Sequence, residues 1–222
     1  MKFNKNPENI KNMFNLISEK YDFVNNLMSL GTQYKIKKDC VKRLGIKSMD
    51  NILDLCCGTG DFCEIIKKEH PNAEILGADF SENMLEIARE KNTCISYVQC
   101  DAVNLPFKDN SFDVVIVVFG LRNILNAEKA VEEIYRVLKP NGKFLHLDFG
   151  KKNIFSKIFD ILAVSLSRIF SENFLAYEYL IRSKNEFPNP EDLIKDFEKK
   201  GFKYLYRQDY IFGVISSQVM KK

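Results

Sequence analysis

A short glycine-containing loop, Asp54 to Gly60, is the segment of this sequence best suited to hold a ligand. Its residues are Asp-Leu-Cys-Cys-Gly-Thr-Gly. Gly58 and Gly60 lack Cβ atoms, so the backbone can turn sharply there and approach a ligand closely. Asp79 and Asp101 follow farther along the chain, each directly after a strand-like run. At the end of a parallel strand, Asp79 can bind both hydroxyl groups of an adenosine ribose, and Asp101 can meet the adenine amino group.

The loop favours S-adenosylmethionine over a dinucleotide. A dinucleotide fingerprint would place a third Gly or Ala shortly after Gly58 and Gly60, but Cys63 stands there. A carboxylate at Asp54 would repel a pyrophosphate, whereas it can pair with the amino-acid end of a methionine-derived cofactor. The alternative is that the two glycines only close a strand–helix turn. Ligand-side features at the ends of three successive strands favour cofactor binding instead.

Strand-like and helix-like segments alternate in the middle of the chain, which is typical of a parallel sheet with helices on both faces. Strands are predicted at 51–56, 74–79, 95–100, 112–118 and 143–149, with helices at 62–69, 81–90 and 127–138 between them. The last of these helices is expected to stop at a breaker cluster, 139–142.

The segments on either side of this core have a different pattern. Residues 7–44 have helical periodicity, 153–184 predict one or two amphipathic helices, and a helix at 192–200 precedes strands at 202–208 and 211–220. The predicted fold is therefore α/β: a Rossmann-like, doubly wound, mostly parallel sheet with an N-terminal helical segment and a helical insertion before the last two strands. We expect one domain, 1–222, with a helical cap (1–45), a cofactor-binding core (46–150) and the insertion with C-terminal strands (151–222).

The composition indicates a globular protein without a metal site. The 222 residues are 45% hydrophobic, and the formal net charge of +3 is too small to indicate a nucleic-acid partner. The six cysteines form no CxxC pair and the two histidines lie far from them, so we expect reduced thiols in a cytoplasmic protein and no bound metal. The N-terminus is too polar for a secretory signal, and the most apolar stretch, 154–180, is interrupted by charged residues.

Several motifs together resemble those of the class I methyltransferases. They are the loop 54–60, Asp79-Phe80-Ser81-Glu82-Asn83-Met84, Asp101-Ala102, Leu105-Pro106-Phe107 and Phe112-Asp113. Two further blocks are similar to signatures of the menaquinone and ubiquinone biosynthesis C-methyltransferases. They are Tyr21-Asp22-Phe23-Val24-Asn25-Asn26-Leu27-Met28-Ser29-Leu30-Gly31, and Phe119-Gly120-Leu121-Arg122-Asn123 followed by Tyr135-Arg136-Val137-Leu138-Lys139-Pro140. The resemblance covers nearly the whole chain, and the Phe-Gly-Leu-Arg-Asn block is its most specific part.

The resemblance implies methyl transfer from S-adenosylmethionine to a ring carbon of a prenylated quinol, as from demethylmenaquinol to menaquinol. It implies cofactor contacts from Thr59, Asp79, Asp101 and Ala102. The full set of predicted cofactor residues is Asp54, Gly58, Thr59, Gly60, Asp79, Phe80, Met84, Asp101, Ala102 and Phe119.

Three positions depart from the family pattern. Tyr34 stands where the first signature usually ends in Trp, and Val118 stands where the residue before the second signature is often Ser. The strand near the second signature usually carries Glu and a polar residue, but here Asp148 is followed by Phe. These departures bear on the acceptor rather than on cofactor binding.

Carbon methylation of a quinol requires a positioned ring, a deprotonated hydroxyl group and the exclusion of water. Arg122 and Asn123 follow the fourth predicted strand, where Arg122 can stabilise a developing quinolate and Asn123 can orient a hydroxyl group. Because arginine is a poor base, we expect deprotonation through a water relay. Tyr21 is expected to close over the cofactor, and Asp148 is a second candidate base. The alternative for Arg122 is an ordinary ion pair within the loop.

A prenylated acceptor would also need an apolar surface. Residues 154–180 are rich in Phe, Ile and Leu and predict a lid over the prenyl chain. A basic stretch (Lys35, Lys37, Lys38, Lys42 and Arg43) predicts peripheral contact with the inner face of the membrane. The alternatives are a helix pair that covers the core and a solvated charged face.

Two other functions stay open at the level of sequence. One is a methyltransferase for another small molecule or for RNA, and the other is a non-catalytic cofactor-binding protein. The chain has Phe-Gly-Leu-Arg-Asn where nucleic-acid amino methyltransferases often carry Asn/Asp-Pro-Pro-Tyr/Phe, so an RNA substrate is disfavoured. No pattern predicts the oligomeric state.

Overall fold

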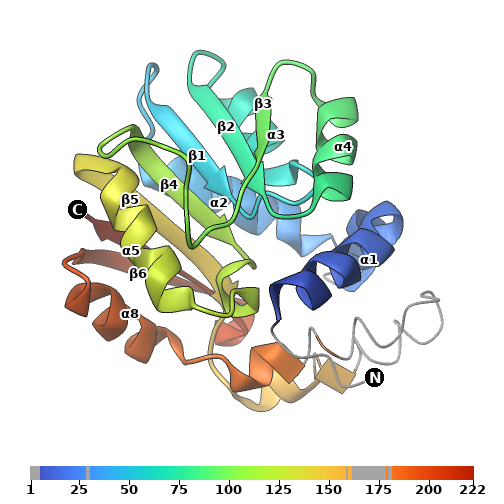
Figure 1. The fold of residues 1–222 in the computed structure, drawn as a ribbon. Coiled ribbons are helices and arrows are strands. Elements are labelled where there is room, and N and C mark those ends of the chain that lie inside the picture. Colours follow the sequence, from blue (N-terminus) through green and yellow to red (C-terminus); the bar gives the residue numbers. More distant parts are fainter. Residues whose placement is uncertain (1–5, 29–30, 159, 162–178, 180–181) are drawn as a thin grey trace.

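The computed structural model describes residues 6–28, 31–158, 160–161, 179 and 182–222, without the side chains of 17 and 19–28. Its centre is a seven-stranded sheet in the order β3-β2-β1-β4-β5-β7-β6 (Figure 1). The strands are β1 Asn51–Leu55, β2 Glu74–Asp79, β3 Ser96–Gln99, β4 Phe112–Val118, β5 Leu138–Phe149, β6 Lys203–Tyr210 and β7 Ile215–Lys221. β1 to β5 pair in parallel, whereas β7 runs antiparallel to both β5 and β6.

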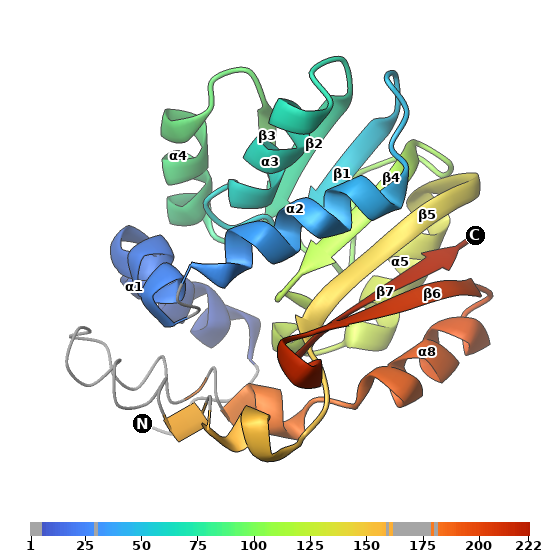
Figure 2. The ribbon, with the colours of Figure 1, turned by 180° about the vertical axis from the view of Figure 1, so that it is seen from behind.

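Helices cover both faces of the sheet (Figures 1 and 2). They are α1 Pro7–Met28, α2 Thr32–Leu44, α3 Asp61–Glu69, α4 Glu82–Lys91, α5 Ala127–Val137 and α8 Pro190–Lys199, with the short 3-10 helices η1 Leu121–Asn123 and η2 Ile211–Gly213. Residues 154–158 and 182–186 are also helical. α2 and α3 pack on one face, and α5 and α8 pack on the other. The predicted doubly wound α/β fold, with its N-terminal helices and its helical insertion before the last two strands, is confirmed.

Local sequence explains most of the element boundaries. Ser81 begins α4 as predicted, because its Oγ accepts a hydrogen bond from the backbone N–H of Met84 at 3.2 Å. Gly31, with a φ of 71°, directly precedes α2 and separates it from α1 within the predicted helical segment 7–44.

The start of β5 differs from the sequence prediction. The strand begins at Leu138 rather than at residue 143, and its pairing with β4 shifts register between Phe112 and Val114. Asn141 takes a positive φ of 68°, so the expected breaker cluster forms an irregularity inside the strand instead of a loop before it. The predicted lid, 154–180, lies mostly outside the described residues.

Candidate active site

A cavity of about 200 Å³ opens at the carboxyl ends of β1, β2 and β4. This is the edge of a doubly wound sheet at which ligands bind, because the strand order reverses between β1 and β4. The predicted cofactor residues that line this first cavity are Gly58, Asp79, Phe80, Met84, Asp101, Ala102 and Phe119. Asn123 lines it from η1, and Ile10, Lys11 and Phe14 line it from α1. Residues from distant parts of the chain therefore enclose one space.

A second cavity, of about 430 Å³, adjoins the first. Cys56, Gly58, Val118 and Phe119 line both cavities, so the two spaces meet at the loop after β1 and the end of β4. The other predicted cofactor residues that line the second cavity are Asp54 and Thr59. Tyr34, at the position where the resembled family usually has Trp, lines it from α2.

Gly60 lines neither cavity, and its role is to let the loop pack closely on β3. A Cβ built on Gly60 would lie 2.7 Å from the hydroxyl oxygen of Tyr97, and the φ of Gly60 is 79°. Any other side chain would push Tyr97 away and strain the turn. Gly60 thus shapes the loop rather than touching the space that a ligand would fill.

Two residues at the junction of the cavities have strained backbones. Cys56, after β1, and Phe119, after β4, have φ values of 61° and 55°, although neither is glycine. Gly120 permits their close approach, because a Cβ there would lie 2.5 Å from the Cβ of Cys56. Backbone strain of this kind persists only where the surrounding structure enforces it, and it concentrates at functional sites.

Asp79 is held in place by the backbone around it. One carboxylate oxygen accepts the Gly58 N–H at 2.8 Å, and the other accepts the Ser81 N–H at 2.9 Å. Burial raises the pKa of Asp79, while these backbone donors oppose that rise. The side chain therefore links the glycine loop to the start of α4 while it lines the first cavity.

Asp54 is a buried carboxylate with one unused oxygen. Its Oδ2 accepts a hydrogen bond from the Cys63 thiol at 3.1 Å, and its Oδ1 has no hydrogen-bond partner among the described residues. Burial raises the pKa of Asp54 to about 7, and the nearby positive charge of Lys37 opposes that rise. A buried acceptor without a donor is costly, so the site is suited to a ligand that supplies one.

Lys37 is a site residue that sequence reasoning placed on a membrane-facing stretch. Its side chain is only 13% exposed, lies 3.8 Å from an Asp61 carboxylate oxygen and lines the second cavity together with Asp54. The signal in the sequence that could have placed Lys37 at the cavity is its position directly after the apolar Ile36, which is buried on α2. The second cavity thus carries one positive side chain, Lys37, and three acidic ones, Asp54, Asp61 and Glu64, of which Asp54 is the buried one.

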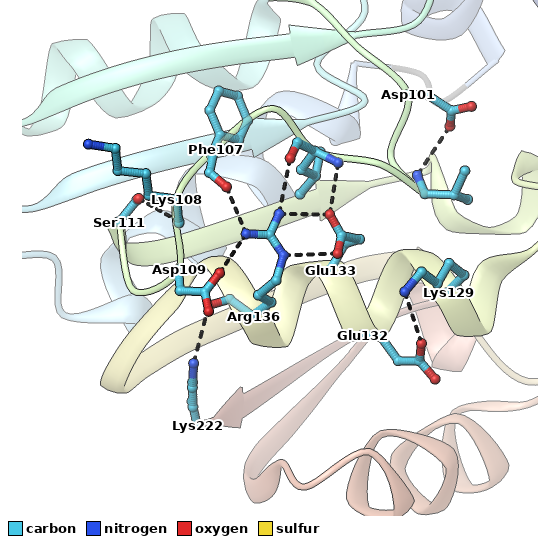
Figure 3. A network of polar contacts seen from close by, with 12 residues as sticks. Asp101, Phe107, Lys108, Asp109, Ser111, Lys129, Glu132, Glu133, Arg136 and Lys222 are labelled. Atoms are coloured by element: carbon cyan, nitrogen blue, oxygen red, sulfur yellow. Dashed lines mark hydrogen bonds and ion pairs between the residues drawn. The ribbon is translucent and has the colours of Figure 1, made fainter.

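The loop that carries Asp101 is fastened to α5 by Arg136 (Figure 3). The guanidinium donates to the backbone carbonyls of Phe107 at 2.7 Å and Leu105 at 3.0 Å. It also pairs with Glu133, which in turn accepts the Leu105 N–H at 2.8 Å. Asp101 itself accepts the Val103 N–H at 3.1 Å. Arg136 and Glu133 therefore fix the segment between β3 and β4 that presents Asp101 to the first cavity.

Arg122 and Asp148 form a buried ion pair behind the cavities. Their side chains are 4% and 0% exposed, and the Arg122 Nη1 lies 2.7 Å from the Asp148 Oδ1. The same nitrogen donates to the Phe119 carbonyl at 2.7 Å, and the guanidinium lies over the ring of Phe149. Neither side chain of the pair lines either cavity. The sequence left open an ion pair within the loop for Arg122, but the partner Asp148 lies on β5, and the pair fixes the backbone of Phe119.

Asn123 is the predicted catalytic residue that reaches the first cavity. Its Nδ2 donates to the Phe119 carbonyl at 3.3 Å, and its buried Oδ1 has no hydrogen-bond partner among the described residues. The amide oxygen is thus available to accept a hydrogen bond from a ligand hydroxyl. Tyr21 belongs to α1, but its side chain lies outside the described residues.

In the part of the chain that the structure describes, no three His, Cys, Asp or Glu side chains are grouped so that they could hold a metal ion. No described helix is long and apolar enough to cross a membrane.

Comparison with known proteins gives consistent matches. Residues 2–222 match the model of the ubiE/COQ5 methyltransferase family. A demethylmenaquinone methyltransferase of Staphylococcus aureus is 37% identical over 220 residues, which cover 94% of this chain and 91% of that protein.

Solved structures share the fold. A SAM-dependent methyltransferase of Thermotoga maritima aligns with a TM-score of 0.69 at 24% identity, over 95% of this chain and 99% of its own. A phosphoethanolamine N-methyltransferase of Haemonchus contortus, solved with S-adenosyl-L-methionine, aligns with a TM-score of 0.59 at 27% identity, over 79% of this chain and 38% of its own.

Proposed function

Because the chain belongs to the ubiE/COQ5 methyltransferase family, we propose that it methylates a ring carbon of a prenylated quinol, converting demethylmenaquinol to menaquinol. The methyl donor is S-adenosylmethionine, and the second product is S-adenosylhomocysteine. In this proposal residues 1–45 cap the cofactor, 46–150 hold it and 151–222 serve the acceptor. The observation that supports it is the pair of joined cavities, whose lining includes Asn123 and all of the predicted cofactor residues except Gly60.

The residues of both cavities fit S-adenosylmethionine. A Cβ on Gly58 would meet no atom within 4 Å, so this part of the loop faces open space. Asp79 and Asp101 in the first cavity suit the ribose hydroxyls and the adenine amino group. In the second cavity, the Asp54 oxygen that has no partner among the described residues matches the ammonium group of the methionine end, and Lys37 matches its carboxylate.

The bound cofactor supplies a methyl group on a sulfonium, which needs neither a metal nor a covalent nucleophile. The protein's own task is to hold the acceptor ring and to favour its deprotonated form. Asn123 serves the first part of that task, because its amide oxygen, which has no partner among the described residues, can accept the hydrogen bond of a ring hydroxyl and so orient the ring. An amide is not a base, so the hydroxyl proton leaves through water. Arg122, tied to Asp148, holds the Phe119 and Asn123 segment in position from behind the cavity.

The acceptor carries a long apolar tail, so the enzyme must reach a membrane lipid. We place the reaction at the cytoplasmic side of that membrane, with peripheral contact between protein and lipid. A tail of this kind also calls for an apolar entrance near the sheet edge that holds both cavities.

The direct test is turnover with defined acceptors. The purified chain is incubated with methyl-labelled S-adenosylmethionine and with chemically reduced demethylmenaquinone or a demethylated benzoquinol, and the lipid products are analysed by mass spectrometry. We expect a label on the naphthoquinol ring. Cofactor binding without any labelled quinone from either acceptor would contradict the proposal.

A pair of variants ties the activity to the site. Asp79→Ala removes the ribose acceptor and should abolish measurable cofactor binding and turnover. Asp196→Ala, an exposed carboxylate on α8, is the matched control and should leave both unchanged. Equal turnover in the two variants would show that the cavity described here is not the site of the reaction.

A further inference from the structure

Six large apolar side chains are exposed around η2 and the helical residues that follow β5. We call them the docking patch: Ile154, Phe155, Ile158, Ile161, Ile211 and Phe212. Phe212 is 76% exposed and Ile161 is 66% exposed. Single exposed apolar residues are normal, but a cluster of this size marks an interaction surface.

The docking patch is rigidly built. The rings of Phe155 and Phe212 stack with centroids 4.5 Å apart, although they come from segments far apart in the sequence. Asn153 joins the two segments: its Oδ1 accepts the Ser156 N–H at 2.9 Å, and its Nδ2 donates to the Phe212 carbonyl at 2.8 Å. The Lys151 N–H donates to the Gly213 carbonyl at 2.7 Å. These bonds hold both aromatic rings at the surface as one unit.

Two residues of the docking patch, Ile211 and Phe212, have strained backbones. Ile211 and Phe212 have φ values of 48° and 54°, in the left-handed region that β-branched and bulky residues avoid. Glycine or asparagine would form this turn at lower cost. A turn of unfavourable residues that presents an aromatic ring to solvent points to a role for that ring outside the fold.

The charge around the docking patch is positive. Lys151, Lys152 and Lys157 are exposed beside it. Lys151 lies 3.8 Å from Glu191 and 4.0 Å from Asp209, whereas neither Lys152 nor Lys157 forms an ion pair with another described residue. Asp160, the acidic residue among the described positions of 151–161, forms an ion pair with Lys184. By contrast, several cations of the basic stretch on α2 are neutralised, since Lys38 pairs with Glu69 and Arg43 pairs with Asp39.

The docking patch lies at the sheet edge that holds the cavities. Phe149, the last residue of β5, pairs with Ile215, the first residue of β7, so η2 lies at the carboxyl end of β5. β1, β2 and β4 end at this same edge, because they run parallel to β5. Figure 2 shows η2 beside the helical segment that follows β5 at this edge.

We propose that the docking patch inserts into an anionic lipid surface, with Phe155 and Phe212 entering the acyl boundary and the lysines contacting lipid phosphates. The inference rests on the proposed function for its purpose, since a prenylated acceptor must be taken from a membrane. Apolar side chains ringed by lysines are the pattern by which proteins bind the interface of anionic membranes. A second copy of this chain would bring the same cations face to face and is disfavoured by their repulsion.

Tryptophan substitution gives a direct readout of insertion, because the chain contains no Trp. Phe212→Trp places one reporter in the docking patch. Met49→Trp is the matched control: Met49 is also 76% exposed, but it precedes β1 at the opposite sheet edge. With vesicles of phosphatidylglycerol and phosphatidylcholine in equal parts, emission should shift to the blue and resist acrylamide quenching only for Phe212→Trp. No change in either variant would overturn the proposal.

Vesicle sedimentation of the full chain measures the two components of binding separately. Phe212→Asn, which suits the left-handed turn, should lower partition into the mixed vesicles by about tenfold. Lys152→Gln and Lys157→Gln should each lower it by about fivefold, and vesicles of phosphatidylcholine alone should remove this dependence. Met49→Asn should change nothing. Equal partition of Phe212→Asn and the original chain would refute insertion.

The test separates this inference from the proposed function. Phe212→Asn should keep normal methyl transfer to a short-chain, water-soluble quinol while losing activity on acceptor embedded in vesicles. If vesicle binding depends on Phe212 but no quinol is methylated, the proposed function fails and the docking patch stands. If quinols are methylated but Phe212→Asn, Lys152→Gln and Lys157→Gln all partition into vesicles like the original chain, the proposed function stands and the docking-patch inference is refuted. Self-association in light scattering that Phe212→Asn abolishes would assign the docking patch to a second copy instead.

Discussion

Lys37 and Asp54 place opposite charges in one cavity, which is the complement of a free amino acid's two termini. We predict that Lys37→Met weakens binding of S-adenosylmethionine by about tenfold, because a charge-assisted hydrogen bond contributes about 1.5–3 kcal/mol. The same substitution should leave binding of decarboxylated S-adenosylmethionine unchanged, since that analogue lacks the partner group. Titration calorimetry with both ligands measures the difference.

The neighbouring lysine provides the control for this prediction. Lys38 lies on the same helix but pairs with Glu69 at 2.7 Å and lines neither cavity. Lys38→Met should therefore leave the affinity for both ligands unchanged. If Lys37→Met weakened both ligands equally, its effect would be on the shape of the cavity rather than on the carboxylate.

Arg122 and Asn123 are adjacent in sequence but should respond differently to substitution. Arg122→Met leaves Asp148 buried without its partner, which should cost about 3–5 kcal/mol of unfolding free energy. Asn123→Ala removes an amide that lines the cavity, so kcat should fall on the order of 10–100-fold with little change in stability. Urea unfolding and steady-state kinetics on both variants measure these effects. A folded Arg122→Met enzyme with full turnover would contradict the positioning role of Arg122.

At the residue scale, the sequence predicts which residues follow a strand better than it predicts where their side chains point. Asp79 and Asp101 follow strands, and the carboxyl ends of parallel strands converge, so both could be placed at the cavity from the pattern alone. Arg122 was equally well placed by sequence, but its side chain turns away from the cavities toward Asp148 on β5. That direction depends on a long-range contact between β5 and the loop after β4, which no local pattern encodes.

Among the elements, α5 does more than cover the sheet. Arg136 on its last turn contacts the backbone at Leu105 and Phe107 and so holds the segment that presents Asp101 (Figure 3). Arg136 Nη2 also donates to one carboxylate oxygen of Glu133, and Nε donates to the other. The planar guanidinium therefore makes several hydrogen bonds at the same time. A lysine cannot reproduce this fork.

Arg136→Lys should therefore loosen the loop without removing the charge. We expect faster amide hydrogen exchange across residues 102–108, a loss of about 1–3 kcal/mol of unfolding free energy and weaker cofactor binding. Exchange followed by mass spectrometry checks the first effect. Lys129→Arg on the exposed side of α5 is the control, and unchanged exchange at 102–108 in Arg136→Lys would show that the loop is held by other contacts.

The ends of helices and strands could be predicted from the sequence where a local signal marks them. They could not be predicted where the pairing of two strands determines them. The side-chain cap at Ser81 and the apolar run at 112–118 place α4 and β4 correctly. The strand predicted at 211–220 instead begins at Ile215, because Ile211 to Gly213 form the tight turn between β6 and β7. Ile211 and Phe212 have strand-like side chains, so only the pairing of the two strands reveals the turn.

For the whole molecule, the order of the strands creates the binding edge. The chain builds β1, β2 and β3 to one side and then crosses to β4 and β5 on the other, which leaves a crevice between the loops after β1 and β4. Strand–helix alternation predicted this much. The return of α1 and α2 over the crevice depends on contacts with α4 and α3 that are distant in sequence, and it brings Lys37 into the second cavity.

The ionisation of Asp54 should make both the unfolding free energy of the whole protein and its affinity for the cofactor depend on pH. The folded protein holds the pKa of Asp54 near 7, above its usual 3.8, because the carboxyl group is buried. Between these values the unfolded chain releases a proton that the folded chain keeps, so the unfolding free energy should fall as pH rises from about 4 to 7. The slope from this one group approaches about 1.4 kcal/mol per pH unit. Asp54→Asn should lack this contribution, and the difference between the two unfolding curves measured at each pH isolates it.

The cofactor should reverse the sign of that pH dependence. An ammonium group beside Asp54 favours the ionised carboxylate, so S-adenosylmethionine should bind more tightly as pH rises through about 7, and it should stabilise the fold most on the alkaline side. Thermal unfolding with and without saturating cofactor at pH 5.5 and pH 8 tests this. Asp54→Asn should bind weakly at both pH values. A wild-type stabilisation that is equal at the two pH values would show that Asp54 does not meet the cofactor's charged end, and the second cavity would then need another occupant.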